Sequence, residues 1–262
     1  MIKLIATDID GTLVKDGSNT LPDKLAETIE RVIDSGIVFA ACTGRSMISA
    51  KRLFGPLQEK IHFITCNGTQ VGHGGKLLFS ETLDRKLLNT MAAEFHEYPN
   101  AVPFFTGADM MYGDIDDKEL LTWLREGYQE DITVVPDMTK APGEFVKLSV
   151  YDRNFQPAAS FRKLIEKWKG TVSIATAGKM WLDIYKPGVN KGTALKKLQE
   201  QLGITREETM AFGDQQNDIG MIREAQYSYA VENALPEVKR EAAGVCGGWE
   251  SLGVCRVLEE LL

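Results

Sequence analysis

Short apolar runs alternate with helical patterns at the start of this chain, and the alternation limits the fold more than any other feature. The apolar runs occupy 2–6, 37–42 and 61–66. Between the first two, apolar residues recur at the spacing of one helix face, at Leu25, Ile29, Val32 and Ile33. Buried strands that alternate with helices predict an α/β fold with a doubly wound parallel sheet.

The middle of the chain has a different pattern. Helical segments at about 86–97, 118–129 and 155–169 are interleaved with strand-like segments at 102–106, 132–135, 145–151, 171–176 and 180–185. In one of the latter, Val146, Leu148 and Val150 alternate with other residues, which is typical of a sheet with one covered face. We therefore predict an α+β domain inserted into a discontinuous α/β domain, with bounds of 84–185 for the insertion and 1–83 plus 186–262 for the rest.

The alternation of helix and strand returns after the insertion. A helical pattern at 192–202 and apolar segments at 209–212, 227–231 and 244–246 precede a closing helix at 253–262. The inserted domain is joined to the rest at about 82–87 and 185–188, and the second joint contains Pro187 and Gly188. Two short joints predict a mobile domain that gates access to a site.

Composition argues against several classes of partner. The 262 residues are 44% hydrophobic and 26% charged, and the formal net charge of -7 gives no electrostatic attraction to nucleic acid or an anionic membrane. No apolar stretch approaches the roughly 20 residues of a membrane helix, and residues 1–3 lead into the first strand without a secretory signal. We expect a cytoplasmic protein and, without a heptad pattern, a monomer or weak homo-oligomer.

Metal chemistry based on sulfur or imidazole is not expected. The four cysteines form no CxxC pair, and the three histidines form no HExxH motif and no close pair in sequence. We expect mostly buried, reduced thiols. We expect His62, His73 and His96 to be surface or hydrogen-bonded side chains rather than zinc ligands.

Two carboxylates directly follow the first apolar run. The period of two in an extended chain puts Asp8 and Asp10 on the same side, where one can attack a substrate and the other can move its proton. Gly11 and Thr12 then turn the backbone away. Open α/β folds hold ligands at this carboxyl edge of the sheet, although an acidic turn alone is also consistent with ordinary structure.

Three later segments end strands or begin helices of the same domain, so folding brings them to the same edge. Thr43-Gly44-Arg45 offers a hydroxyl and backbone N–H groups at a helix start, which suits an anion. Residues 213–218 supply carboxylates and an amide that suit Mg²⁺, and Lys191 lies at another helix start. Taken singly, Thr43-Gly44-Arg45 is usually an ordinary turn, the acidic segment is as readily a helix cap, and a lone lysine is nearly always exposed to solvent.

The set as a whole resembles the haloacid dehalogenase-like (HAD) phosphohydrolase superfamily. Its four motifs are present in order: DxDGT at 8–12, a Thr-Gly turn at 43–44, the lysine at 191 and GDxxND at 213–218. The large insertion between the second and third motifs, together with the phrases CNG, GVNKG and VENALPEVK, is similar to the Cof-type, type IIB capped branch. The resemblance covers essentially the whole chain and implies a Rossmann-like core with a cap that sets specificity.

This resemblance implies a role for each matched residue. Asp8 would be the nucleophile that forms an aspartyl-phosphate, and Asp10 the general acid and base. Mg²⁺ would bind the carboxylates of Asp8 and Asp214 and the main-chain carbonyl of Asp10. Asp218 would orient Lys191 or a metal-bound water rather than bind the metal directly. The residues that would bind the substrate phosphate are Thr43, Gly44, Lys191 and Asn217.

Two further observations concern specificity. The chain reads Val231-Glu232-Asn233-Ala234 where the family often has Met-Gly-Asn-Ala, so a charged side chain stands near the rim of the site. Four aromatic residues of the insertion would line either the substrate face of the cap or its core, and the preference of aromatic side chains for burial favours the core: Phe104, Phe105, Trp181 and Tyr185.

We expect a phosphomonoester hydrolase that uses Mg²⁺ and acts on small phosphorylated metabolites, with sugar phosphates suggested by the resemblance. A phosphomutase of the phosphomannomutase type is an alternative, because such capped relatives return the phosphoryl group to a sugar instead of water. A non-catalytic phosphometabolite-binding protein is another, although binding alone does not require the proton-transfer acid Asp10. The sequence does not name the substrate.

Overall fold

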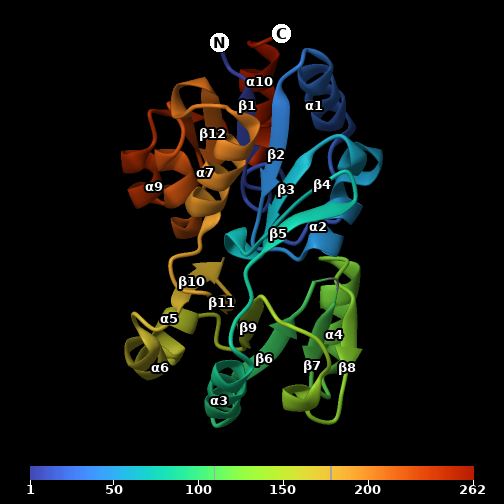
Figure 1. The fold of residues 1–262 in the computed structure, drawn as a ribbon, viewed down its shortest axis with the longest axis vertical. Helices are drawn as coiled ribbons and strands as arrows, with labels where there is room; N and C mark the ends of the chain where they lie inside the picture. The colour runs from blue at the N-terminus through green and yellow to red at the C-terminus, as the bar shows by residue number, and fades with distance from the viewer. Residues whose placement is uncertain (109, 178) are drawn as a thin grey trace.

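The computed structural model describes residues 1–108, 110–177 and 179–262, which form two β-sheets (Figure 1). Along the larger sheet the strands follow the order β14-β13-β12-β1-β2-β3-β4-β5, and along the smaller sheet β10-β11-β9-β6-β7-β8. The two ends of the chain build the larger sheet, and the middle of the chain builds the smaller one. The predicted fold class, an α/β core with an inserted α+β cap, is confirmed.

The strands of the larger sheet from β14 to β3 are parallel. β1 lies between β12 and β2, and all its residues are buried, as expected for a central strand covered on both faces. The bounds are β1 Leu4–Thr7, β2 Val38–Cys42, β3 His62–Thr65, β12 Thr209–Gly213, β13 Tyr227–Val231 and β14 Gly244–Cys246.

An antiparallel hairpin that the sequence patterns did not predict extends this sheet. β4 (Gln70–His73) pairs with β3, and β5 (Lys76–Ser80) pairs with β4. Gly74 and Gly75, which both have positive φ, make the turn between β4 and β5. The hairpin lacks the pattern of a buried strand because β5 lies at the sheet edge and exposes Leu77 and Leu78.

The same hairpin brings together in space two histidines that are far apart in sequence. His62 on β3 lies opposite His73 on β4, and the ring centroids are 4.0 Å apart. His73 Nδ1 forms a hydrogen bond with the Ile61 carbonyl at 3.0 Å, whereas His62 is buried and its Nδ1 has no hydrogen-bond partner among the residues described. Strand register produces this pair, and spacing along the sequence does not reveal register.

Helices pack on the larger sheet in two groups. Helix α1 lies beside α10 (Figure 1), and α8 packs against both α7 and α9. Helix α1 (Asp23–Asp34) buries Leu25, Ile29 and Val32, which are residues of the apolar face seen in the sequence. The remaining bounds are α2 Met47–Phe54, α7 Lys191–Leu202, α8 Ile219–Arg223, α9 Pro236–Glu241 and α10 Gly253–Glu259.

The smaller sheet is antiparallel except where β7 pairs with β8. Its strands are β6 Ala101–Thr106, β7 Met111–Gly113, β8 Ile132–Val134, β9 Lys147–Asp152, β10 Ser173–Ala177 and β11 Trp181–Tyr185. Its helices are α3 Arg85–His96, α4 Lys118–Glu126, α5 Pro157–Ser160 and α6 Arg162–Trp168. The short strand β7 was not predicted. The single helix expected at 155–169 is divided, because the backbone of the buried Phe161 leaves the helical conformation between α5 and α6.

Two short connections join the sheets, between β5 and α3 and between β11 and α7 (Figure 1). Both chain termini lie at the end of the larger unit that is remote from the smaller one (Figure 1). We keep 1–83 plus 186–262 and 84–185 as proposed domain boundaries and call the two parts the core and the cap. Within the described ranges, none of the helices combines the length and apolar character that crossing a membrane requires.

Candidate active site

The predicted acids lie at the carboxyl edge of the larger sheet. Asp8 follows β1, Asp214 follows β12 and Thr43 follows β2. Because these three strands are adjacent and parallel, their ends place the three turns side by side. Within the described residues, Asp8, Asp214 and Asp218 form a cluster with one carboxylate oxygen from each, all within 4.8 Å of one another.

Lys191, which as an isolated lysine would be expected in solvent, is completely buried between two of these carboxylates. Its Nζ donates to Asp8 Oδ1 at 2.6 Å and to Asp218 Oδ1 at 2.6 Å. Burial alone would lower the pKa of Lys191, but Asp218 and Asp8 outweigh burial and raise it. The ammonium group therefore stays charged at the first position of α7, beside the Asp8 carboxylate.

Asp218 has both carboxylate oxygens engaged by the protein. While Oδ1 accepts from Lys191, Oδ2 accepts from the backbone N–H groups of Asp214 and Gln215, each at 2.9 Å. An acid held in this way orients its neighbours. These contacts support the positioning role that the resemblance implied for Asp218.

Asp8 and Asp214 are the acids suited to hold a cation. Burial, with Asp218 and Asp214 as like charges, raises the pKa of Asp8 well above its usual value, although Lys191 opposes the rise. Burial and Asp218 raise the pKa of Asp214 to about 6. Crowded, buried carboxylates of this kind gain from a nearby divalent cation, and their oxygen donors suit Mg²⁺. The residues present therefore fit a divalent metal.

The turn after β1 allows this crowding because it contains glycine. Gly11 has φ +83°, and a Cβ there would lie 2.4 Å from Asp214 Oδ2. Thr12 from the same turn donates its hydroxyl to Asp214 Oδ1 at 3.1 Å. Gly11 and Thr12 of the DxDGT motif thus shape the acid cluster as well as turning the chain.

Arg45 holds the second acid of this motif, a role that the sequence did not reveal. Its Nε donates to Asp10 Oδ2 at 2.7 Å and its Nη2 to Asp10 Oδ1 at 2.5 Å. Nη2 also donates to the Ser18 carbonyl at 2.7 Å. Arg45 is buried, and the guanidinium lies 5.1 Å from the ring centroid of Tyr128 in the cap. Burial alone would lower the pKa of Arg45, but the hydrogen bonds and charge of Asp10 raise it.

The residues predicted to bind phosphate lie around Asp8. Thr43 and Gly44 line the same pocket as Asp8, Asp10 and Asp214. Asn217 lines it too, but its Nδ2 donates to Asn67 Oδ1 at 2.8 Å. The structure thus brings all eight predicted residues together, with Lys191 and Asp218 just behind the pocket wall. The roles assigned to them remain proposals.

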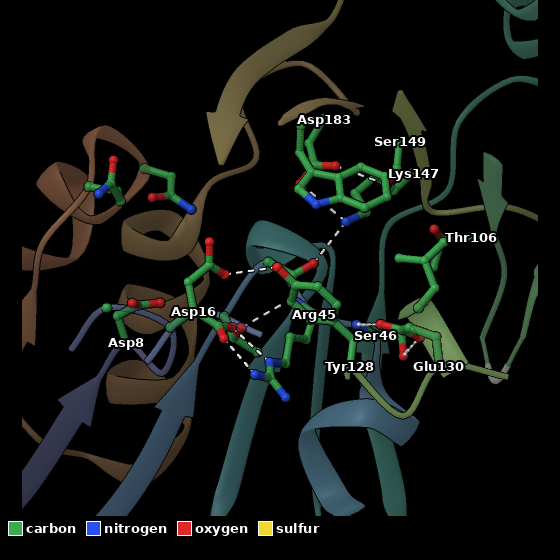
Figure 2. A pocket seen from close by; sticks show the side chains of 18 of the residues that line it. Asp8, Asp16, Arg45, Ser46, Thr106, Tyr128, Glu130, Lys147, Ser149 and Asp183 are labelled. Atoms are coloured by element: carbon green, nitrogen blue, oxygen red, sulfur yellow. Dashed lines mark hydrogen bonds and ion pairs between the residues drawn. The ribbon is translucent and has the colours of Figure 1, made fainter. Parts of the chain in front are cut away.

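The cap closes the pocket from the opposite side (Figure 2). Lys147 and Ser149 of β9 and Asp183 of β11 face the core site there, and none was predicted (Figure 2). The polar positions of the alternating β9 strand were a usable signal for the first two. Glu130, from the loop after α4, accepts from the Ser46 backbone at 3.3 Å and from its hydroxyl at 2.5 Å; burial raises the pKa of Glu130 although these bonds oppose the rise.

The four aromatic residues singled out in the cap divide between its hydrophobic interior and the pocket. Phe104 and Phe105 are fully buried and Tyr185 nearly so, as we expected. Trp181 instead lines the pocket, so the expectation of a position in the hydrophobic interior of the cap was wrong for this residue. It is the first residue of β11, and its ring lies against those of Phe104 and Tyr151 on the cap sheet. Glu232 is exposed and lies outside the pocket lining.

Known proteins resemble this chain in both sequence and fold. A model of the haloacid dehalogenase-like hydrolase family matches residues 5–258. The chain belongs to this family of hydrolases.

Relatives and solved structures match it over nearly their whole length. The 5-amino-6-(5-phospho-D-ribitylamino)uracil phosphatase YbjI of Escherichia coli is 26% identical, covering 100% of this chain and 96% of the relative. The HMP-PP phosphatase of Cronobacter sakazakii is 28% identical, covering 92% of this chain and 88% of the relative. A solved structure from Eubacterium rectale is 34% identical with a TM-score of 0.87, covering 100% of this chain and 99% of that one.

The HAD subclass IIB sugar phosphatase BT4131 has a TM-score of 0.84 at 22% identity, covering 99% of this chain and 98% of that one, and so shares the fold. The family predicted from the motifs is confirmed, and the fold is that of its Cof-type, subclass IIB capped members. The prediction of an enzyme is confirmed at the same level, because the chain is a hydrolase of a family whose curated relatives include phosphatases.

Proposed function

We propose that the protein is a Mg²⁺-dependent phosphomonoester hydrolase that acts on small phosphorylated metabolites through an aspartyl-phosphate on Asp8. The observation that carries the proposal is the buried Lys191, which donates to both Asp8 and Asp218. Asp8 and Asp214 line a pocket beneath the cap. Phosphatases among the relatives, which act on a phosphoribitylamino-uracil and on HMP-PP, support a small phosphorylated substrate. Sugar phosphates remain the first candidates, and cytoplasmic location and a monomeric or weakly associated state remain predictions.

The proposed reaction has two displacements with balanced proton transfer. An Asp8 carboxylate oxygen bonds to phosphorus while the bond to the leaving oxygen breaks, and Asp10 gives that oxygen a proton. Asp10 then takes a proton from water, whose oxygen bonds to phosphorus as the Asp8–phosphorus linkage breaks. Inorganic phosphate leaves, and both acids return to their starting states.

The metal would be held by the carboxylates of Asp8 and Asp214 and the main-chain carbonyl of Asp10. When bound, it supplies positive charge that offsets the repulsion between a carboxylate and a phosphate, which is about 4 kcal/mol per charge pair at about 4 Å and an effective dielectric constant near 20. Lys191 supplies a second positive charge from the protein itself. Thr43, the Gly44 N–H and Asn217 would bind the remaining phosphate oxygens.

The alternatives differ in where the phosphoryl group goes. A phosphomutase would return it to a sugar, and a phosphometabolite-binding protein would not move it at all. Asp10 lines the same pocket as Asp8, and a second acid there favours a protein that transfers protons to and from oxygen, because binding alone does not require one.

A panel of sugar phosphates and other phosphate esters, assayed with Mg²⁺ and then with EDTA, tests the proposal. We expect release of inorganic phosphate that depends on Mg²⁺ and is abolished by Asp8→Asn. Asp152→Asn, which changes a buried cap carboxylate outside the pocket, is the matched control and should retain turnover. Isomerisation without phosphate release would indicate the mutase, and no turnover across the panel would indicate the binding protein.

A further inference from the structure

The segment Cys66-Asn67-Gly68, a one-turn 3-10 helix after β3, has no part in the proposed chemistry. Asn67 is completely buried and has φ 59°, a left-handed conformation that asparagine tolerates better than most residues. A Cβ on Gly68 would lie 2.4 Å from the Asn190 carbonyl, so this turn packs directly against the start of α7, where Lys191 lies. Its position is thus fixed by the same helix that positions the lysine.

Asn67 connects the predicted phosphate site with the cap. Its Oδ1 accepts from Asn217 Nδ2 at 2.8 Å, and its Nδ2 donates to Asp183 Oδ2 on β11, also at 2.8 Å. Asn217 belongs to the core and Asp183 to the cap. A single buried amide therefore bonds to the core at one end and to the cap at the other.

The cap side of this connection returns to the core through a buried ion pair. Lys147 Nζ lies 3.2 Å from Asp183 Oδ2 and donates to the Gly44 carbonyl at 2.8 Å. Ser149 donates to the other oxygen of Asp183 at 2.9 Å. Lys147 and Asp183 expose only 7% and 4% of their side chains, so separating them from the core would disturb charges that have little access to water.

We propose that Asn67 is a positioning residue that couples the phosphate site to cap closure. It fixes the amide of Asn217 and holds the Asp183–Lys147 pair against the core, so that binding in the phosphate site and docking of the cap stabilise each other. Because such coupling is reciprocal, a variant that repels the cap also weakens binding of a phosphate mimic. The inference rests on the proposed function insofar as Asn217 is taken as a phosphate-binding residue.

A charge exchange between Asn67 and Asp183 tests this role. Asn67→Asp places two carboxylates face to face, whereas Asn67→Asp combined with Asp183→Asn restores one carboxylate and one amide with unchanged total charge. The readouts are KM and kcat for a hydrolysed phosphate ester, and the change in tryptophan fluorescence on titration with orthovanadate and Mg²⁺, because Trp181 lines the pocket.

We expect Asn67→Asp to raise KM and weaken vanadate binding by about tenfold, equivalent to about 1.4 kcal/mol, with a smaller effect on kcat. In the Asp183→Asn background the same substitution should improve both readouts, which a merely destabilising change would not do. Asn100 supplies the control: its Nδ2 donates to Asp152 Oδ1 at 2.6 Å within the cap, and Asn100→Asp should leave KM and vanadate binding unchanged.

Thermal unfolding of each variant separates an effect on folding from an effect on coupling. Where Asn67→Asp does not fold, the comparison of Asp183→Asn with the double variant tests the role of Asn67. Effects that add in the double variant, or an Asn67→Asp protein with unaltered KM and vanadate binding, would overturn the role of Asn67. A wild-type protein that binds vanadate with the predicted coupling but hydrolyses no ester would instead overturn the proposed function alone.

Discussion

At the scale of single residues, the chemistry depends on which carboxylate oxygens the protein leaves free. Both oxygens of Asp218 are engaged, and only Oδ1 of Asp8 is paired with Lys191. Asp10 is held at both oxygens by Arg45. Among the described residues, one carboxylate oxygen of Asp8 therefore has no hydrogen-bond partner, and Asp10 is held in one orientation.

Arg45 is predicted to act through Asp10. Arg45→Met should lower kcat by about tenfold or more, because a misoriented acid loses part of the rate that general acid–base catalysis supplies. The same substitution should have little further effect in an Asp10→Asn background, and kcat measured for the four combinations checks this.

A suitable control for this cycle is Arg223→Met, which breaks an equally bidentate pair with Glu241, both bonds being 2.8 Å, on the exposed surface. It should leave kcat unchanged. Full additivity of the Arg45 and Asp10 substitutions would contradict a role through Asp10.

Motifs predicted the positions of the site residues but not their partners. The spacing of Asp8, Asp10 and residues 213–218 at strand ends was sufficient to place them at one edge, because parallel strands share that edge. Arg45 stood in a recognised turn, yet the direction of a long side chain cannot be deduced from its neighbours in sequence. Contacts such as Asn67 with Asp183 depend on how the cap docks on the core.

At the scale of elements, the turn after β1 packs closely against the acid cluster. It approaches Asp214 so closely that only a residue without Cβ fits at position 11. Gly36, after α1, has a similar φ of +90°, but a Cβ there would meet no atom of the described residues within 4 Å. Comparing substitutions at Gly11 and Gly36 therefore separates the effect of backbone strain from the effect of crowding Asp214.

Gly11→Ala is therefore predicted to impair the site beyond its effect on stability. Both Gly11→Ala and Gly36→Ala should lose about 1 kcal/mol or more of unfolding free energy, because alanine is strained at positive φ. Only Gly11→Ala should raise the Mg²⁺ concentration needed for half-maximal activity, since its methyl group displaces Asp214. Equal Mg²⁺ requirements in the two variants would contradict this account.

The hairpin of β3 and β4 predicts a pH dependence of stability. Burial, and to a lesser extent His73, lowers the pKa of His62 to about 4, from an unfolded value of about 6.5. Between these values the unfolded chain takes up a proton that the folded protein does not, so stability is lost as the pH falls from about 6.5 towards 4.

Urea unfolding at about pH 7 and about pH 5 checks this sign. The wild-type protein should lose more unfolding free energy over this interval than His62→Gln, which lacks the titrating ring. An equal loss in the two proteins would show that His62 is not responsible.

At the scale of the whole molecule, the site lies between two units that the chain connects twice. The core supplies the acids and the lysine, and the cap supplies Lys147, Ser149 and Asp183 (Figure 2). The docked cap is also held at α2, where Arg52 forms two bonds with Asp131, at 2.8 and 3.0 Å. Chemistry and access are thus assigned to different parts of the chain.

The division into two sheets followed from the sequence, because the parallel strands are continuous apolar runs, whereas β9 alternates apolar with polar residues. The hairpin β4–β5, the short β7 and the docking of cap on core did not follow. Edge strands and interfaces between units combine polar and apolar residues, so periodicity identifies them poorly.

Trapping of the phosphorylated enzyme tests the central claim most directly. The protein is mixed with Mg²⁺ and a hydrolysed phosphate ester, quenched in acid during turnover, and digested for mass spectrometry. We predict a phosphoryl group on the peptide that contains Asp8, absent from Asp8→Asn, which should also fail to release phosphate. Turnover with the phosphoryl group on another residue, or continued hydrolysis by Asp8→Asn, would contradict the account.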